Sequence, residues 1–162
     1  MNFLKCILYM AAVGVLGFVL GRLVPKDWFD WDRFPYRPFS FEKGGKFYHR
    51  LKIRQWQDRI PDMSRIFPGL MPRKQMPEHP TVENITRMLQ ETCVAELTHW
   101  LLCMAGLFLL WLWPGLGGIL LAFVYIILGN LPFVAVQRYN RPRLRRMLQH
   151  LQTNKAAEKP KE

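Results

Sequence analysis

From Leu97 to Val136 the sequence contains no lysine, arginine, aspartate or glutamate, and only the stretch PGLGG interrupts its apolar character. The first arm of this run, Leu97 to Trp113, and the second, Ile119 to Val136, each approach the roughly 20 residues that a helix needs to cross a bilayer. Pro114 and the glycines behind it break helices. The run therefore predicts a transmembrane helical hairpin with a tight turn, and it excludes an ordinary soluble fold.

Another apolar run, FLKCILYMAAVGVLGFVLGRLV, lies at the N-terminus. It lacks an A-x-A site before the polar segment, so we expect a retained anchor and not a cleaved signal peptide. Gly17 and Gly21 form a small-x-x-x-small pair, which indicates close packing against another helix. The sequence thus predicts an all-α integral membrane protein with about three transmembrane helices. The expected single membrane domain, 1–162, comprises transmembrane helices 3–24, 97–113 and 119–136, a cytoplasmic interfacial segment 25–96 and a basic cytoplasmic tail 137–162.

The net charge of +11 fits either a nucleic-acid binder or a small membrane protein with basic edges. The charged residues flank the apolar runs and do not coat a soluble fold, which excludes nucleic acid as a partner. Five arginines follow the last apolar run: Arg138, Arg141, Arg143, Arg145 and Arg146. Positive charge marks cytoplasmic ends, so we expect a multi-pass protein of the cell membrane with its N-terminus outside and its C-terminus inside.

The segment between the first two spans has three parts. Residues 25–45 are rich in proline and aromatic residues, which is typical of an interfacial loop. Residues 46–60 predict one amphipathic helix on the membrane surface. Its expected apolar positions are Phe47, Leu51, Ile53, Trp56 and Ile60. Residues 61–80 predict a loop, and a second amphipathic helix is expected to start near Thr81 and to continue without a break into the apolar run.

Polar residues gather at the base of the predicted hairpin. Because its arms are antiparallel, AELTHW and VQRYNRPR are expected side by side at the cytoplasmic boundary. Glu96 and His99 share one helix face at i and i+3. A neutral histidine can act as a general base, and a carboxylate can fix its tautomer. Spacing alone leaves three interpretations open: a proton-transfer site, a structural Glu96–Arg138 pair, or a binding site for lipid head groups.

No metal or tightly bound cofactor is expected. Cys6, Cys93 and Cys103 match no zinc-binding spacing and are interpreted as free thiols. The Glu96-x-x-His99 spacing occurs in carboxylate-bridged metal sites, but those sites repeat the motif and this chain has one copy.

Three blocks of the sequence resemble the glycosyl-4,4'-diaponeurosporenoate acyltransferase family, small bacterial membrane enzymes of C30 carotenoid biosynthesis that yield staphyloxanthin-type products. The blocks are FSFEKGGKFYHRLKIRQWQDRIPD (39–62), ETCVAELTHW (91–100) and NLPFVAVQRYNRPRL (130–144). The string QRYNRPR is the most specific of these, followed by the ELxHW core.

The resemblance implies transfer of a fatty acyl group from a thioester, on coenzyme A or an acyl carrier protein, to a hydroxyl of a membrane glycolipid. His99 would then deprotonate the acceptor, Glu96 would orient His99, and Arg138, Tyr139 or Asn140 would stabilise the oxyanion. Basic residues would attract the donor's phosphates. The expected substrate-binding residues are Gln137, Tyr139, Asn140, Arg141, Arg143, Glu42, Lys46 and His49. Membrane lipids, the acceptor and the donor are the expected partners.

Two other functions remain open. A small membrane methyltransferase or reductase is one, although the sequence shows no glycine-rich nucleotide loop. The other is a non-enzymatic lipid-binding or assembly subunit, in which the arginines bind only anionic head groups.

Overall fold

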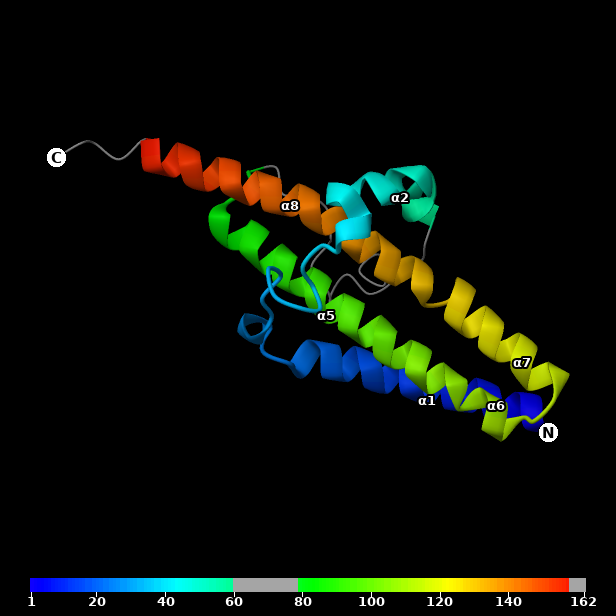
Figure 1. The fold of residues 1–162 in the computed structure, drawn as a ribbon. Helices are drawn as coiled ribbons and strands as arrows, with labels where there is room; N and C mark the ends of the chain where they lie inside the picture. The colour runs from blue at the N-terminus through cyan, green and yellow to red at the C-terminus, as the bar shows by residue number, and fades with distance from the viewer. Residues whose placement is uncertain (60–78, 158–162) are drawn as a thin grey trace. The chain divides into compact units, whose positions relative to one another are not determined.

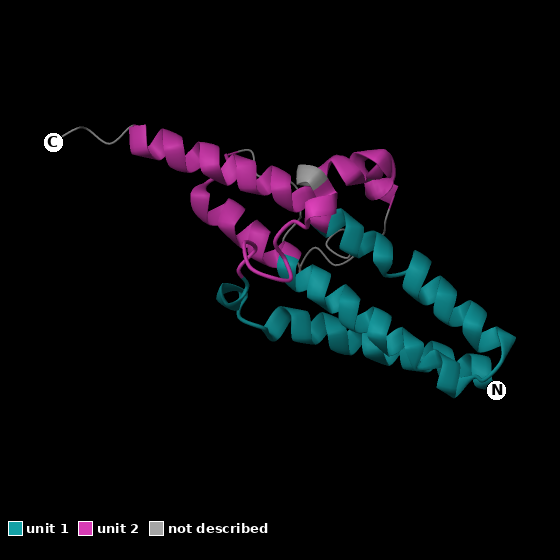
Figure 2. Cartoon of the chain, in the orientation of Figure 1, with its two compact units in different colours: residues 1–29, 93–137 teal, residues 30–92, 138–162 magenta. Residues whose placement is uncertain are grey.

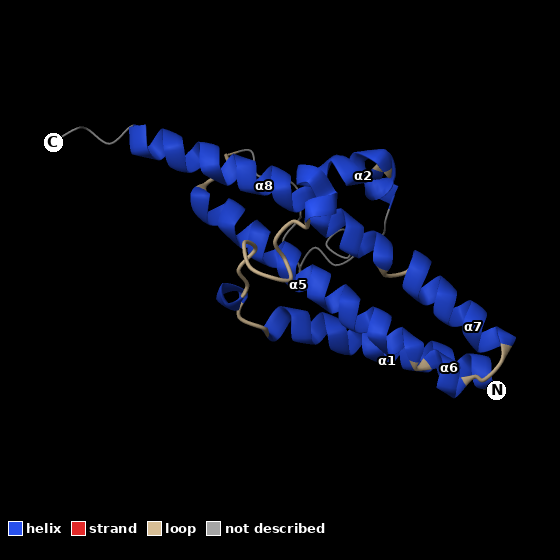
Figure 3. Cartoon of the chain, in the orientation of Figure 1, coloured by secondary structure: helices blue, strands red, loops and turns tan. Residues whose placement is uncertain are grey.

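The computed structural model describes residues 1–59 and 79–157. In this part of the chain every regular element is a helix or helical turn (Figures 1 and 3), which confirms the all-α prediction. The elements are α1 (Asn2–Leu23), η1 (Lys26–Trp28), η2 (Ser40–Gly45), α2 (Lys46–Arg50), α3 (Ile53–Trp56), η3 (Gln57–Arg59), α5 (Val82–Leu107), α6 (Leu109–Leu112), α7 (Leu116–Phe123), a π-helical turn (Val124–Leu128) and α8 (Leu131–Ala157).

Within the described residues, three helical stretches are long and apolar enough to cross a bilayer: Asn2–Leu23, Val82–Leu112 and Leu116–Ala157. Their apolar side chains point mostly outward, since only 6% of the most apolar window of the first stretch is buried inside the protein. Water would make such an outward apolar surface costly, whereas lipid tails solvate it. The prediction of about three transmembrane helices is confirmed.

The chain divides into two compact units (Figure 2). Unit 1 comprises Met1–Phe29 and Cys93–Gln137, and unit 2 comprises Asp30–Thr92 and Arg138–Glu162. Helices α5 and α8 each contribute residues to both units.

In unit 1, α1 packs antiparallel to α5. The Tyr9 hydroxyl donates a 3.0 Å hydrogen bond to the carbonyl of Ala105. Further along α1, Gly17 and Gly21 face Thr98, and a Cβ on Gly21 would lie 3.2 Å from the Thr98 hydroxyl oxygen. The predicted close packing of the two glycines against another helix is therefore confirmed. A small buried cluster lies elsewhere in this unit: Cys6, Leu109 and Ala122.

The turn between α6 and α7 depends on Gly115, whose φ of 106° lies in the left-handed region that favours glycine. Close to this turn, the ring of Phe3 lies 6.2 Å from that of Trp113, edge to face. The N-terminus and the hairpin turn thus lie at the same end of unit 1. This arrangement is the one that the predicted topology requires. The face of the membrane on which that end lies stays a prediction.

The second arm of the hairpin differs from the uninterrupted span that the sequence predicted. After α7, the Gly129 amide donates to the Val124 carbonyl at 3.0 Å, an i to i−5 bond that makes a π-helical turn. A Cβ on Gly129 would lie 2.6 Å from the Tyr125 carbonyl oxygen, so only glycine allows this approach. Glycine here therefore permits a wider turn, and Asn130 follows it just before α8.

Gly106 of α5 provides a test of unit 1 packing. A Cβ there would lie 2.8 Å from a ring carbon of Tyr125 and 2.9 Å from Ile126, so Gly106→Ala forces neighbours apart. We expect it to destabilise the protein by about 1–3 kcal/mol. Gly14→Ala is the matched control, because a Cβ at Gly14 meets nothing within 4 Å. Thermal unfolding in detergent measures both, and equal midpoints would contradict the packing.

The core of unit 2 joins α5 to α8 through four buried residues: Ile85, Leu89, Leu144 and Leu148.

The Thr81 hydroxyl caps α5 by accepting the Asn84 amide at 3.2 Å, which confirms the predicted helix start near Thr81. Helix α8 continues through Pro142 without a break. Proline removes one helical hydrogen bond, and the packed face of Leu144 and Leu148 offsets that loss.

The single amphipathic helix predicted over residues 46–60 was also wrong. Lys52 has a φ of 52° and separates α2 from α3. An unbroken helix would place Tyr48 and Ile53 on different faces, because five residues correspond to about 500° of rotation. The break lets both become buried, while Phe47 and Leu51 are exposed. Ile60 and most of the predicted 61–80 loop lie outside the described residues.

Candidate active site

His99 lies on α5 in unit 1, half-buried within the apolar run. Its Nδ1 atom is 2.9 Å from the Oδ1 atom of Asn130. Its ring stacks on Phe133 of α8, with ring centres 4.5 Å apart and planes 13° apart. The imidazole is therefore held by two residues of the second hairpin arm.

Asn130 is 3% exposed and was not among the site residues predicted from the sequence. A buried amide in an apolar run was the signal that could have found it, because polar groups at membrane depth are costly and often functional. Glu96, 2% exposed, lies one helical turn before His99, and the buried Gln137 belongs to the same unit. Orientation of His99 by Glu96 stays a prediction.

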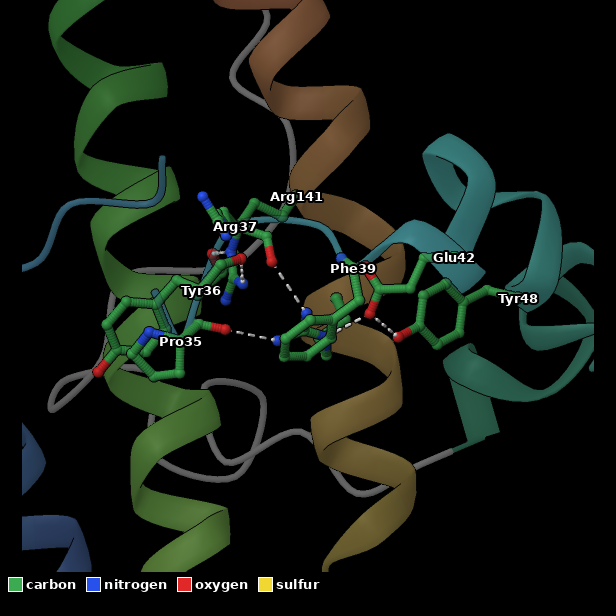
Figure 4. Close-up of polar contacts among 9 residues, drawn as sticks. Pro35, Tyr36, Arg37, Phe39, Glu42, Tyr48 and Arg141 are labelled. Atoms are coloured by element: carbon green, nitrogen blue, oxygen red, sulfur yellow. Dashed lines mark hydrogen bonds and ion pairs between the residues drawn. The ribbon is translucent and has the colours of Figure 1, made fainter. Parts of the chain in front are cut away.

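The other predicted site residues belong to unit 2, where Glu42 is the centre of a buried polar cluster. Glu42 is 1% exposed, and its Oε1 atom accepts hydrogen bonds of 2.6 Å from both Arg138 Nε and the Tyr48 hydroxyl. Its Oε2 atom accepts the backbone amide of Phe39 at 3.1 Å. Figure 4 shows Glu42 and Tyr48 pointing toward one another. Three donors thus satisfy a carboxylate that would otherwise be costly to bury.

Two arginines of α8 bind residues 35–42, termed here the strap. Arg138 donates from its two terminal nitrogens to the carbonyls of Pro35 and Arg37, at 3.2 Å each. Arg141 donates to the Tyr36 carbonyl at 2.7 Å and, through Nε, to the Thr92 hydroxyl at 3.0 Å. The guanidinium of Arg138 also lies 4.4 Å from the centre of the Phe39 ring. These contacts give both arginines a structural role, and their predicted roles in catalysis and binding stay predictions.

Burial raises the pKa of the Tyr48 hydroxyl well above its ordinary value, and the hydrogen bond to Glu42 adds to this rise. Arg138 acts in the opposite direction but does not reverse it. The phenol therefore stays protonated at neutral pH and remains a hydrogen-bond donor to Glu42.

Tyr139 contacts two other predicted substrate-binding residues. The His49 ring meets it edge to face at 5.6 Å, and the Arg143 guanidinium lies 4.1 Å from its ring centre. Tyr139 is 2% exposed, and within residues 1–59 and 79–157 its hydroxyl is the buried side-chain polar atom that makes no hydrogen bond. Such an atom costs stability unless another group satisfies it. Lys46 is exposed, and Asn140 is half-buried.

The described residues hold no group of three histidine, cysteine, aspartate or glutamate side chains that could bind a metal ion.

Taken together, the fold and His99 define a small helical membrane protein that holds an imidazole within an apolar helix. A family model described as glycosyl-4,4'-diaponeurosporenoate acyltransferase matches residues 25–150. The chain belongs to this family, and it is therefore an acyltransferase.

Curated relatives agree with the family match. The chain is 30% identical to the glycosyl-4,4'-diaponeurosporenoate acyltransferase of Staphylococcus aureus strain N315 over 150 residues, which is 90% of this chain and 87% of the relative. The proteins of the same name from strains USA300 and MRSA252 are 31% and 29% identical over the same shares. No solved structure matches the chain.

Proposed function

We propose that this acyltransferase moves a fatty acyl group from a thioester donor to a sugar hydroxyl of a glycosylated, carotenoid-like lipid in the membrane. The name shared by its relatives, which refers to a glycosylated diaponeurosporenoate, supports this acceptor class. Three apolar helical stretches in the described chain provide surroundings in which such a lipid would be soluble.

The observation that carries the proposal is the held imidazole of His99, with Nδ1 against Asn130 and its ring against Phe133. In the proposed reaction, the other ring nitrogen accepts the proton of the acceptor hydroxyl. The hydroxyl oxygen attacks the thioester carbonyl, a carbon–oxygen bond forms, and the carbon–sulfur bond breaks. The proton then passes to the departing thiolate, so histidine is restored to its neutral form.

We assign donor binding to the basic C-terminal part of α8, at the cytoplasmic face. Coenzyme A carries phosphates, and an acyl carrier protein presents its thioester on a phosphopantetheine arm. Arg143, which lies over the Tyr139 ring, and the exposed Arg146 are suited to such anions. The oxyanion role that the resemblance assigns to Arg138, Tyr139 or Asn140 stays a prediction, as does the substrate-binding role of Lys46 and His49.

The test uses the purified full chain in lipid nanodiscs with a glycosylated C30 carotenoid acid and either acyl-coenzyme A or acyl-carrier protein. Mass spectrometry is expected to show the acceptor gaining one ester-linked acyl chain, with release of free thiol. A methyl or hydride change in the acceptor would instead indicate a methyltransferase or reductase. An unchanged acceptor with both donors would contradict the proposal and favour a lipid-binding subunit.

A further inference from the structure

We propose that Asn130 is the positioning residue of this enzyme: it holds His99 in the tautomer that carries its proton on Nδ1 and its lone pair on Nε2. This inference rests on the proposed role of His99 as general base. The orienting role predicted for Glu96 is untested, and the 2.9 Å contact between His99 Nδ1 and Asn130 Oδ1 adds a second residue that can orient the ring.

The direction of this hydrogen bond follows from the second contact of the same amide. Asn130 Nδ2 lies 2.9 Å from the backbone carbonyl oxygen of Tyr125. A carbonyl oxygen can only accept, so the amide NH₂ must point toward Tyr125 and Oδ1 must point toward His99. An amide oxygen is also only an acceptor. His99 Nδ1 therefore carries the hydrogen, and a neutral ring then has its basic lone pair on Nε2.

The π-helical turn explains why the amide can be held in this way. Its widened backbone brings the Tyr125 carbonyl within reach of the Asn130 side chain, which lies five residues later. Gly129 allows that approach because a side chain there would clash with the same carbonyl. The Asn130 backbone is tied to the turn as well, since its amide donates to the Ile126 carbonyl at 3.3 Å.

Phe133 restrains the orientation of the His99 ring plane. The hydrogen bond to Asn130 selects the nitrogen that faces the second arm, and the stacked Phe133 ring restrains the tilt of the ring plane. The Phe133 amide donates to the Asn130 carbonyl at 3.1 Å, so both restraints come from one short segment. Holding a base in its reactive geometry raises the rate of the chemical step and leaves ground-state binding of the substrate unaffected.

A neutral amide also suits this depth in the membrane. It selects the tautomer without adding a formal charge to an apolar run that contains none from Leu97 to Val136.

The kinetic test compares Asn130→Leu, which removes both amide contacts, with Asn130→Asp, which retains an acceptor oxygen in the same place. We expect Asn130→Leu to lower kcat about 10- to 100-fold with KM little changed, by analogy with other partners that orient histidines. Asn130→Asp should recover part of the lost kcat. Thr98→Val is the matched control, because the Thr98 hydroxyl donates to the Val94 carbonyl of its own helix at 2.9 Å, a local hydrogen bond that does not involve His99. An unchanged kcat in Asn130→Leu, or no recovery in Asn130→Asp, would overturn the inference.

A spectroscopic test does not depend on turnover. Solid-state NMR of ¹⁵N-histidine-labelled full-length protein in bilayers distinguishes the two neutral tautomers, and His99→Gln identifies the His99 signals. We expect a protonated Nδ1 and an unprotonated Nε2 in the wild type, and a mixture of tautomers in Asn130→Leu. An Nε2-protonated wild type would overturn the inference. Full activity in His99→Ala would instead refute the base role while leaving the tautomer measurement valid.

Discussion

Replacing His99 with alanine is expected to lower kcat for acyl transfer by about 10²- to 10⁴-fold, the usual contribution of a general base. The imidazole is the group that Asn130 and Phe133 hold within the apolar helix. Without it, the acceptor hydroxyl must lose its proton to water, which is scarce at membrane depth. The measurement is ester formation by the purified variant in nanodiscs, with donor and acceptor both saturating.

His150→Ala is the control for this experiment, because His150 is an exposed histidine near the end of α8. It should retain wild-type activity. Both variants must also show wild-type helicity by circular dichroism, so that lost activity is not lost folding. Full acyl transfer by well-folded His99→Ala would remove His99 from the mechanism.

The second large effect is expected at Glu42. Glu42→Ala takes the shared acceptor from Arg138 and Tyr48 and leaves a guanidinium, 7% exposed, without its carboxylate. Removing one member of a buried ion pair costs about 3–5 kcal/mol. Hydrogen–deuterium exchange of the strap amides is the most direct measurement, and we expect faster exchange over residues 35–42.

The exposed ion pair between Asp32 and Arg145 supplies the matched control. Its atoms are 3.2 Å apart, but the side chains are 47% and 44% exposed. Asp32→Ala should therefore cost at most about 1 kcal/mol and leave strap exchange nearly unchanged. If Glu42→Ala resembled Asp32→Ala in both respects, the buried cluster would not be what holds the strap.

The helices were predictable from the sequence where one local signal dominated. Uncharged apolar runs predicted the membrane-crossing helices, and apolar residues at helical spacing predicted the start of α5 near Thr81. The sequence did not decide whether the helix continues through Pro142; it does, with Leu144 and Leu148 buried on the far side of the proline. Lys52 carries no local signal for positive φ, so the break between α2 and α3 could not be foreseen.

The sequence indicated which residues belong to the candidate site better than it indicated which of them contact one another. His99 was identified from its place in an apolar helix, whereas its partner Asn130 depends on a π-helical turn that no simple periodicity reveals. The arginines of QRYNRPR were identified as important, but the carbonyls that Arg138 and Arg141 bind lie about 100 residues earlier in the chain, with sequence separations of 103 and 105. Carbonyls belong to every residue, so composition gives no indication of which ones an arginine will bind.

That mode of binding has a consequence for how the protein can diverge. Arg138 and Arg141 bind main-chain oxygens of Pro35, Tyr36 and Arg37, and those oxygens survive almost any change of side chain. A saturation library should therefore tolerate many substitutions at Arg37, whose side chain is exposed, while Arg138 and Arg141 tolerate few. Sequence variation in this part of the protein would then concentrate in the strap, while the two arginines that bind its main chain vary little.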